Sequence, residues 1–284
     1  MRKLERTEEA RSGFRHAGRA LAVAGLCLSL WSCGTFDEEP PVYVEQPVEV
    51  LYNDAMNAMQ AGNLGEAARL FDEVERQHPY SSWAAKAQIM AAYAYYQGNR
   101  YDEAINALDR FIQLHPGNKD AAYAYYLKAV SYYEQISDVG RDQRATKQSL
   151  AALKEVVGRY PESSYARDAV LKIDLALDHL AGKHMNIGRY YLGQGEYLAA
   201  INRFRLVIRD FQTTTHVPEA LHRLVECYLA LGVTDEAQAT AAVLGYNYPG
   251  SIWYADSYVL LTGTDLRPQE QNDSWISRMW NSII

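Results

Sequence analysis

The feature that most constrains the fold is an alanine followed twelve residues later by a proline. This pair occurs three times, as Ala67 and Pro79, Ala104 and Pro116, and Ala237 and Pro249. A glycine lies five or six residues before each alanine: Gly62, Gly98 and Gly232. Such self-similarity predicts a repeated unit. A small residue lets two helices approach closely and a proline ends the second, so the unit predicted is a helical hairpin.

The flanking apolar positions resemble the tetratricopeptide repeat (TPR). A large apolar residue recurs four places after the alanine, another seven places after it, and an aromatic residue in the preceding helix. The three sets are Phe71, Leu108, Leu153 and Phe204; Val74, Phe111, Val156, Val207 and Leu244; and Tyr95, Tyr132, Tyr191 and Tyr228. Ser149 and Ala200 occupy the alanine position in two further repeats. We therefore predict an all-α, right-handed superhelical solenoid of about five TPR-type hairpins with a capping helix.

This register predicts a repeat domain over residues 48–262. The repeats are expected at about 48–82, 83–119, 120–164, 165–216 and 217–250, with the cap at 251–262. The third repeat has eight extra residues around Ser137–Arg144, which indicate a polar loop. Gln212 stands where the fourth repeat would have its proline, so the end of that repeat is less well defined.

The N-terminus has the pattern of a secretory signal over residues 1–32. Six Lys and Arg residues in the first 19 positions precede the uncharged apolar run Ala20–Leu30, which is too short to span a membrane. The run leads into Leu30-Trp31-Ser32-Cys33-Gly34, which resembles the bacterial lipobox. This resemblance implies lipidation of Cys33 and, through Gly34, sorting to the outer membrane. A chance cysteine after an ordinary cleaved signal is the alternative. Residues 33–47 include three prolines and are interpreted as a flexible tether.

Charge and motifs argue against several function classes. Without residues 1–32 the chain has 22 Lys and Arg against 32 Asp and Glu, an unfavourable balance for binding nucleic acid. The sequence contains no H-E-x-x-H, G-x-S-x-G or phosphate-binding loop. His179 and His184 are about 140° apart around a helix, so they are poorly placed to share a metal. Cys227 is left without a disulfide partner and is interpreted as a small buried residue. We expect no catalytic residues, metal or cofactor, and no enzyme activity.

The register also predicts a peptide-binding groove on the concave face of the solenoid. The first helices of repeats one to three contribute a stripe rich in Tyr and Met, residues that suit an extended apolar peptide. The predicted groove residues are Tyr52, Met56, Met59, Ile89, Tyr93, Tyr96, Tyr123, Tyr126 and Tyr133. The equivalent positions of the C-terminal repeats are more charged and predict a different partner site at Arg189, His222 and Glu226. The alternative is that these side chains simply pack against neighbouring helices.

The links between repeats point to one family. The strings His78-Pro79-Tyr80-Ser81-Ser82, Tyr160-Pro161-Glu162-Ser163-Ser164 and Tyr248-Pro249-Gly250-Ser251, together with the lipobox, resemble the BamD family over about residues 30–262. This is the repeat-lipoprotein family of the outer-membrane β-barrel assembly machinery.

The resemblance implies a non-enzymatic scaffold, lipid-anchored at the periplasmic face of the outer membrane. Its expected partners are the periplasmic domain of the barrel-forming core subunit, at the C-terminal repeats, and unfolded outer-membrane proteins, at the N-terminal repeats. Other assembly lipoproteins are also expected. Another periplasmic repeat adaptor, coordinating cell-wall or envelope proteins, is the alternative.

The C-terminal tail, residues 263–284, has no counterpart in this resemblance. If this tail is helical, Trp275, Met279, Trp280 and Ile283 share one face, which would dock on another surface that the sequence does not identify. A frayed tail is the other reading.

Overall fold

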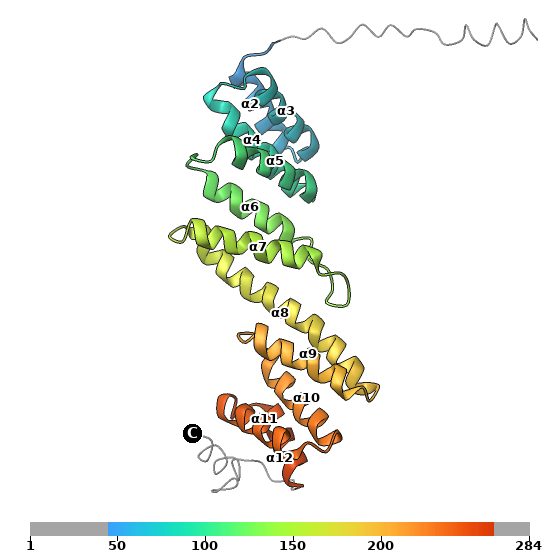
Figure 1. Cartoon of the computed structure of the whole chain (residues 1–284). Helices are drawn as coiled ribbons and strands as arrows, with labels where there is room; N and C mark the ends of the chain where they lie inside the picture. The colour runs from blue at the N-terminus through green and yellow to red at the C-terminus, as the bar shows by residue number, and fades with distance from the viewer. Residues whose placement is uncertain (1–44, 264–284) are drawn as a thin grey trace, which may run out of the picture. The chain divides into compact units, whose positions relative to one another are not determined.

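The computed structural model describes residues 45–263, and this part of the chain is all-helical, as predicted (Figure 1). Five helical hairpins are followed by a single helix. The hairpins are α2 (Val48–Gln60) with α3 (Leu64–Gln77), α4 (Ser82–Gln97) with α5 (Tyr101–Leu114), α6 (Ala121–Tyr133) with α7 (Arg144–Arg159), α8 (Ser164–Gly193) with α9 (Tyr197–Asp210), and α10 (Val217–Ala230) with α11 (Thr234–Asn247); the final helix is α12 (Ile252–Thr262). None of these described helices is both long and apolar enough to cross a membrane.

The interior of each hairpin is built from the predicted repeat positions. The small residues of the second helices are completely buried: Ala67, Ala104, Ser149, Ala200 and Ala237. The large residues four and seven places later are buried as well, among them Phe71, Phe111, Leu153, Phe204 and Leu244. The buried Ser149 hydroxyl donates a hydrogen bond to the Ala129 carbonyl of the facing helix at 3.4 Å, so its polar group is satisfied in this apolar position. The repeat register therefore identifies the core correctly.

The short turns within the first, second, fourth and fifth hairpins each have one residue with a left-handed backbone. Gly62, Gly195 and Gly232 adopt φ values of 75–78°, which cost a glycine nothing. In the second hairpin the left-handed residue is Asn99, with φ 57°, and not the preceding Gly98. Gly98 instead lies where a side chain would crowd the Ala94 carbonyl, because an added Cβ would be 3.3 Å from that oxygen.

The links between hairpins show why the Pro-x-Ser strings recur. Ser81, Ser163 and Ser251 are the N-caps of α4, α8 and α12, and each hydroxyl accepts a hydrogen bond from a backbone N–H of the first turn. The backbone N–H of each serine also donates to the carbonyl of the residue three places earlier, at 3.0 Å. The strings therefore encode one turn, which starts the next helix: α4, α8 or α12.

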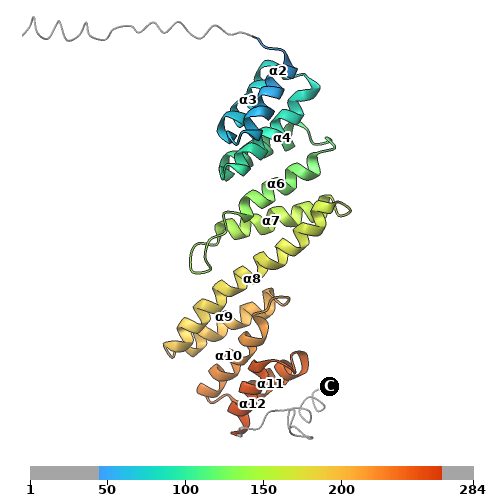
Figure 2. The same cartoon turned by 180° about the vertical axis from the view of Figure 1, so that it is seen from behind.

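Helix α8 is the exception to the repeat. It has 30 residues, about twice the length of the other helices, and packs along α7 with its N-terminal part and along α9 with its C-terminal part (Figures 1 and 2). An added Cβ at Gly188 would lie 2.5 Å from the Phe204 ring, so the absence of a side chain lets α8 approach α9. The loop between α6 and α7 is held against α8 by His179, whose Nε2 is 2.7 Å from the Ser137 carbonyl, and by Lys183, whose Nζ donates to the Gly140 carbonyl.

Candidate protein-binding surfaces

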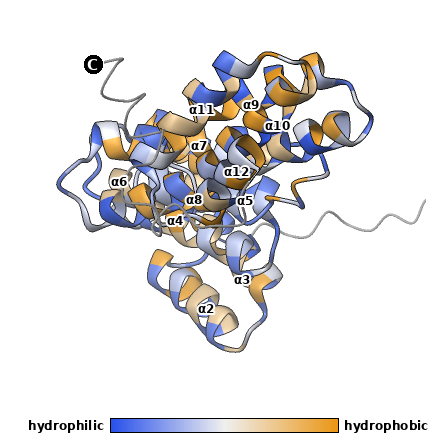
Figure 3. Ribbon diagram, turned by 90° about the horizontal axis from the view of Figure 1, so that it is seen from below, coloured by the Kyte–Doolittle hydropathy of each residue, from blue (hydrophilic) through white to orange (hydrophobic). Residues whose placement is uncertain are grey.

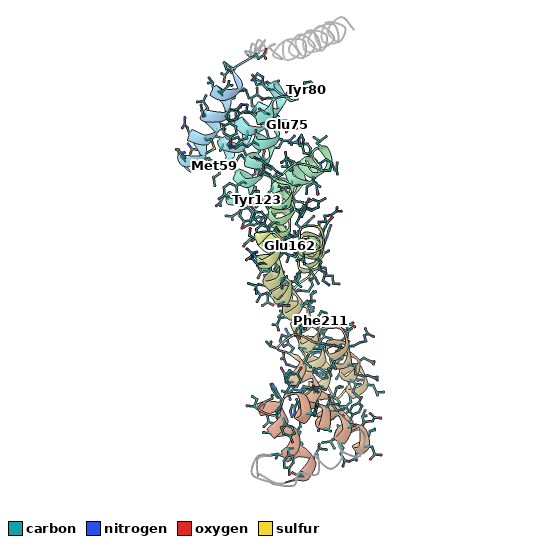
Figure 4. The ribbon with its side chains drawn as sticks, turned by 90° about the vertical axis from the view of Figure 1, so that its left-hand side faces the viewer. Met59, Glu75, Tyr80, Tyr123, Glu162 and Phe211 are labelled. Atoms are coloured by element: carbon teal, nitrogen blue, oxygen red, sulfur yellow. The ribbon has the colours of Figure 1, made fainter. Side chains whose placement is uncertain are left out.

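Half-buried tyrosines from three consecutive first helices form one candidate surface. We call it the tyrosine surface; its members are Tyr93 and Tyr96 of α4, Tyr123, Tyr126 and Tyr133 of α6, and Tyr165 of α8. Figure 4 marks Tyr123 on the stretch of chain between Met59 of the first hairpin and Glu162 before α8. These side chains pack with one part of each ring on the cores of the second and third hairpins and leave the rest accessible.

The rings of the tyrosine surface contact one another across the hairpin boundary. Tyr165 stacks on Tyr126 with ring centroids 5.2 Å apart, and its centroid is 5.5 Å from that of Tyr123. These separations lie in the range in which aromatic pairs are favourable. The N-terminal end of α8 therefore extends the surface beyond the third hairpin.

The Tyr126 hydroxyl of this surface is fixed by a hydrogen bond, and Tyr133 by a neighbouring charge. The Tyr126 hydroxyl donates to Oδ2 of Asp168 at 2.5 Å, and Asp168 is paired with Lys172 at 2.8 Å. The Lys172 ammonium lies 5.7 Å from the centre of the Tyr133 ring, a cation–π contact. These contacts hold the rings of Tyr126 and Tyr133 in place before any ligand arrives, so binding would not have to order these two side chains.

The hydroxyls at the centre of the surface stay protonated at neutral pH. Burial, with the neighbouring hydroxyls of Tyr93, Tyr165 and Tyr96, raises the pKa of Tyr123 to about 12. Burial and the nearby Glu134 carboxylate raise the pKa of Tyr96 to about 12. The surface is therefore neutral and apolar over its rings. The protons of Tyr126 and Tyr96 are directed to Asp168 and Glu134, whereas a hydroxyl such as that of Tyr93, which accepts from Gln97, can donate to a ligand.

Two predicted groove residues belong to the core. Tyr52 is 6% exposed because the rings of Phe71 and Trp83 lie 5.3 and 4.8 Å from its own. Ile89 is also 6% exposed and packs in the core between α4, α5 and α6. The prediction that these two line a groove is wrong, since side chains of the adjoining helices cover both. Met56 and Met59 of α2 are half-buried at the edge of the first core.

Sequence reasoning missed Tyr165. The fourth repeat was predicted to begin at about residue 165, but its first turns were assigned no groove residue. The signal was present, because Ser163 is an N-cap residue and no proline or glycine interrupts residues 164–181. An uninterrupted helix from Ser164 would have placed Tyr165 beside the third hairpin.

A second candidate surface consists of paired charges on α8 and α10. We call it the charged network; its members are Arg189, Glu219, His222, Arg223 and Glu226. The Arg189 guanidinium donates two hydrogen bonds to the Glu219 carboxylate, at 2.8 and 2.5 Å. Arg223 donates to Glu226 at 2.8 Å and lies 3.4 Å from Glu219. The network therefore ties the first helices of the fourth and fifth hairpins together.

His222 is not available to a partner. It is 3% exposed, its Nδ1 lies 2.8 Å from the Ser257 hydroxyl, and its ring lies 5.3 Å from that of Trp253. The prediction that His222 lies on a partner surface is wrong because α12, which supplies Ser257 and Trp253, covers it. Arg189 and Glu226 remain partly accessible.

The carboxylates of the network are ionised at neutral pH. Burial by itself raises the pKa of Glu219, but the hydrogen bonds and charges of Arg189 and Arg223 outweigh it, and the net pKa lies below the ordinary value. Burial is likewise outweighed at Glu226, whose pKa is lowered by His222 and Arg223. Glu219 is 8% exposed, so it is a buried charge that depends on its two arginines.

The reactive side chains of the described region are used structurally. Burial raises the pKa of the Cys227 thiol to about 11, which keeps it protonated and unreactive near neutral pH. His179 contacts the loop before α7, as described above, and the His184 ring lies 5.8 Å from that of Phe211. Within residues 45–263, no three His, Cys, Asp or Glu side chains are grouped so that they could hold a metal ion.

Comparison with known proteins identifies the family. The family model described as YfiO, outer membrane lipoprotein, matches residues 44–244, which run from before α2 to within α11 of the fifth hairpin. The chain belongs to this family. Among the relatives of this family is an outer membrane protein assembly factor BamD of Caulobacter vibrioides, 54% identical over 249 residues, which cover 87% of this chain and 82% of the relative. Proteins of the same name from Rickettsia prowazekii and Neisseria meningitidis are 46% and 33% identical, over 85% and 82% of this chain and 95% and 92% of their own length.

Proposed function

We propose that this chain is an outer membrane protein assembly factor that acts as a binding scaffold. The observation that carries the proposal is the tyrosine surface, which continues across three consecutive first helices in a member of this lipoprotein family. Its side chains offer apolar contact and hydrogen bonding together. No bond needs to be made or broken on a ligand held in this way, so the proposed role is not enzymatic.

The tyrosine surface is proposed to bind the C-terminal segment of unfolded outer-membrane β-barrel proteins. Such a segment is extended and has bulky apolar side chains on one face, which match the rings, and free backbone carbonyls, which match the hydroxyl donors. Tyr93 can serve as an anchor, because its hydroxyl accepts a hydrogen bond from Gln97 of the same helix, at 2.7 Å, and keeps its own proton for a ligand. Tyr126 and Tyr165 form the stacked part of the surface beyond it.

The C-terminal hairpins are proposed to bind the periplasmic domain of the barrel-forming core subunit. Arg189, Arg223 and Glu226 are partly accessible and already held by their pairs. Charged groups fixed in this way favour a specific partner with complementary charges over indiscriminate binding. Other assembly lipoproteins are proposed to join the same complex.

The chain is proposed to be attached through lipidated Cys33 to the periplasmic face of the outer membrane. Cys33 follows the apolar run and lies outside the described residues, as do the signal peptide and most of the tether. Acylation at Cys33 would supply the chains needed for stable anchoring, since none of the helices in residues 45–263 is suited to span a membrane. Mutation of Cys33→Ser should move the protein from the membrane fraction to the soluble periplasmic fraction, and retention in the membrane would contradict the anchor.

Co-purification and site-specific photocrosslinking test this function together. The tagged chain purified from outer membranes should bring with it an integral β-barrel protein with periplasmic domains. A photoreactive residue in place of Tyr93 should crosslink to newly synthesised barrel proteins. The same residue in place of Tyr125, on the other side of α6 against Tyr160, should not. Recovery of cell-wall enzymes without a β-barrel protein would favour the other adaptor role, and equal crosslinking at both positions would reject the tyrosine surface.

A further inference from the structure

The loop between α6 and α7 encloses a cavity against the C-terminal half of α8. Figure 1 shows this loop projecting beside α8. The cavity has a volume of about 410 Å³ and is lined by loop residues 140–143, by Lys147 of α7 and by Leu180, Lys183 and His184 of α8. No member of the tyrosine surface or of the charged network lines it. The cavity is therefore separate from both candidate protein-binding surfaces.

The wall that the loop contributes is fixed by hydrogen bonds. The Gln143 side chain is buried, and its amide donates to the carbonyls of Asp138 and Arg141, at 3.2 Å each. Its Oε1 accepts a hydrogen bond from the Thr146 hydroxyl of α7 at 2.9 Å. The wall is thus in place before any ligand binds, which reduces the entropy lost on binding.

Positive charge is concentrated at this cavity. Arg141, Lys147 and Lys183 line it, and within residues 45–263 none of the three forms an ion pair with a carboxylate. Lys183 bonds instead to a neutral carbonyl of the loop. Asp142 is the one carboxylate among the lining residues, and it accepts a hydrogen bond from the Arg144 backbone N–H at 3.2 Å. Three cations against one carboxylate leave two positive charges in excess.

This excess is not explained by the composition of the chain or of its loops. The connections between helices are largely hydrophilic, as their blue colour in Figure 3 shows, so a polar loop is ordinary here. The whole chain, however, has 35 Asp and Glu against 28 Lys and Arg. In an acidic chain, unpaired cations that converge on one cavity indicate a place for an anion.

The imidazole of His184 is sensitive to the charge of this cavity. Burial lowers its pKa, and the charges of Arg203 of α9, Lys147 and Lys183 lower it further, against the opposing charge of Asp210. The His184 Nδ1 atom is buried and makes no hydrogen bond to a described residue. An anion in the cavity would favour the protonated imidazole and therefore raise this pKa.

The lining residues suit a phosphate group. A terminal phosphate has close to two negative charges at neutral pH and three strong acceptor oxygens. An arginine guanidinium binds phosphate through two parallel hydrogen bonds, and a lysine ammonium binds it as a point charge. The two excess positive charges match a terminal phosphate better than a single carboxylate, which has one negative charge and two oxygens.

We infer that this cavity is a binding site for a terminal phosphate group, held by Arg141, Lys147 and Lys183. The group is either free phosphate or the phosphomonoester headgroup of a lipid, and the same three cations would hold it in both cases. This inference does not depend on the proposed function, because it uses none of the residues assigned to protein binding.

NMR titration of the His184 ring in the full chain tests the inference. Inorganic phosphate should raise the His184 pKa saturably, by about 0.5 or more beyond the effect of sodium chloride at the same ionic strength, which only screens charge. Arg141→Gln combined with Lys147→Gln should increase the Kd for phosphate roughly tenfold or more. This double variant keeps the hydrogen bond from Lys183 to the loop, so the cavity wall stays in place.

The matched control is Lys119→Gln combined with Lys154→Gln, which removes the same charge from exposed positions that do not line the cavity. Its Kd for phosphate should equal that of the wild type. Circular dichroism checks that both double variants keep their helices. An equal loss of affinity in the two double variants would overturn the inference, because binding would then depend on net charge alone.

A second probe separates the two sources of phosphate. Dihexanoylphosphatidic acid is a soluble lipid with a phosphomonoester headgroup. A lower Kd for this lipid than for inorganic phosphate would support the site and assign it to a headgroup, and the reverse order would support the site and assign it to free phosphate. No saturable His184 response to either probe would overturn the inference. A response to a glutamate-rich peptide but to neither phosphate probe would also overturn it, in favour of an acidic protein segment.

Discussion

Arg189 of α8 holds Glu219 of α10 through two parallel hydrogen bonds, at 2.8 and 2.5 Å, and this pair connects two successive hairpins. The Glu219 side chain is 10% exposed, whereas that of Arg189 is 39% exposed. The acid is thus the more buried partner. Hydrogen bonds from Arg189 replace those that water would make to its carboxylate. Loss of this ion pair would destabilise the packing of the fourth hairpin on the fifth.

Arg189→Ala is expected to lower the free energy of unfolding by about 1–3 kcal/mol, because it leaves a buried carboxylate without its bidentate donor. Urea unfolding followed by circular dichroism measures the change. Arg205→Ala, on the exposed part of α9, is the control and should change stability by less than about 0.5 kcal/mol. Equal stability of the two variants would show that the pair contributes nothing.

The contribution of Glu219 should depend on pH in the acid range. Its pKa in the folded chain lies below the ordinary value of 4.5, so the folded state favours the ionised form. The stabilisation is therefore complete above about pH 4.5 and is lost as the pH falls through the lowered pKa of the folded state. The stability difference between the wild type and Glu219→Gln, measured by urea unfolding from pH 7 to pH 3, should shrink toward the acid end. A difference that grows as the pH falls would have the wrong sign for this account.

Gly188→Ala is expected to destabilise the fourth hairpin by about 1–3 kcal/mol. The added methyl group would lie 2.5 Å from the Phe204 ring, so α8 and α9 would have to separate. Gly193→Ala, five residues later in the same helix, meets no atom within 4 Å and should be neutral or stabilising. Thermal unfolding of the two variants checks this, and restored stability in Gly188→Ala with Phe204→Leu would confirm the steric cause. Similar midpoints for both glycine variants would contradict it.

Tyr126→Phe is expected to cost about 1 kcal/mol of stability, because it removes the hydrogen bond to Asp168 and leaves the ring stack with Tyr165 in place. Denaturant unfolding measures the loss, and Tyr125→Phe on the other side of α6 is the control. A loss no greater than that of the control would show that the Asp168 bond does not hold the tyrosine surface in place.

Much of the fold could be predicted from the sequence because the repeat constrains it. The alanine at one position and large apolar residues four and seven places later report close helix packing, and all of these positions are buried where predicted. The N-cap serines and left-handed glycines follow from local backbone geometry. The length of α8 was not predicted, because the register locates the small and large apolar positions of a repeat and does not give the length of its first helix.

The surfaces were harder to predict for a physical reason. Register gives the direction of a side chain on its own helix, but its exposure depends on what the next hairpin places over it. Trp83 covers Tyr52, and Trp253 of α12 packs on His222. The repeat position of Tyr52 or His222 does not reveal that a tryptophan from the next helix lies over it. Tyr93 and Tyr126 are half-buried on successive first helices, α4 and α6, although the Tyr165 ring stacks on Tyr126. Their role in binding remains a prediction.

The most direct test of the tyrosine surface is the affinity of the full chain for a synthetic peptide with the aromatic C-terminal segment of an outer-membrane β-barrel protein. Tyr93→Ala combined with Tyr126→Ala should weaken binding by about 2–4 kcal/mol, or roughly 30- to 800-fold in Kd. The matched double variant Tyr125→Ala with Tyr160→Ala, which removes a ring pair on the other side of α6, should bind as the wild type does. Unchanged affinity in the first variant with its helicity intact, or an equal loss in both, would contradict the account.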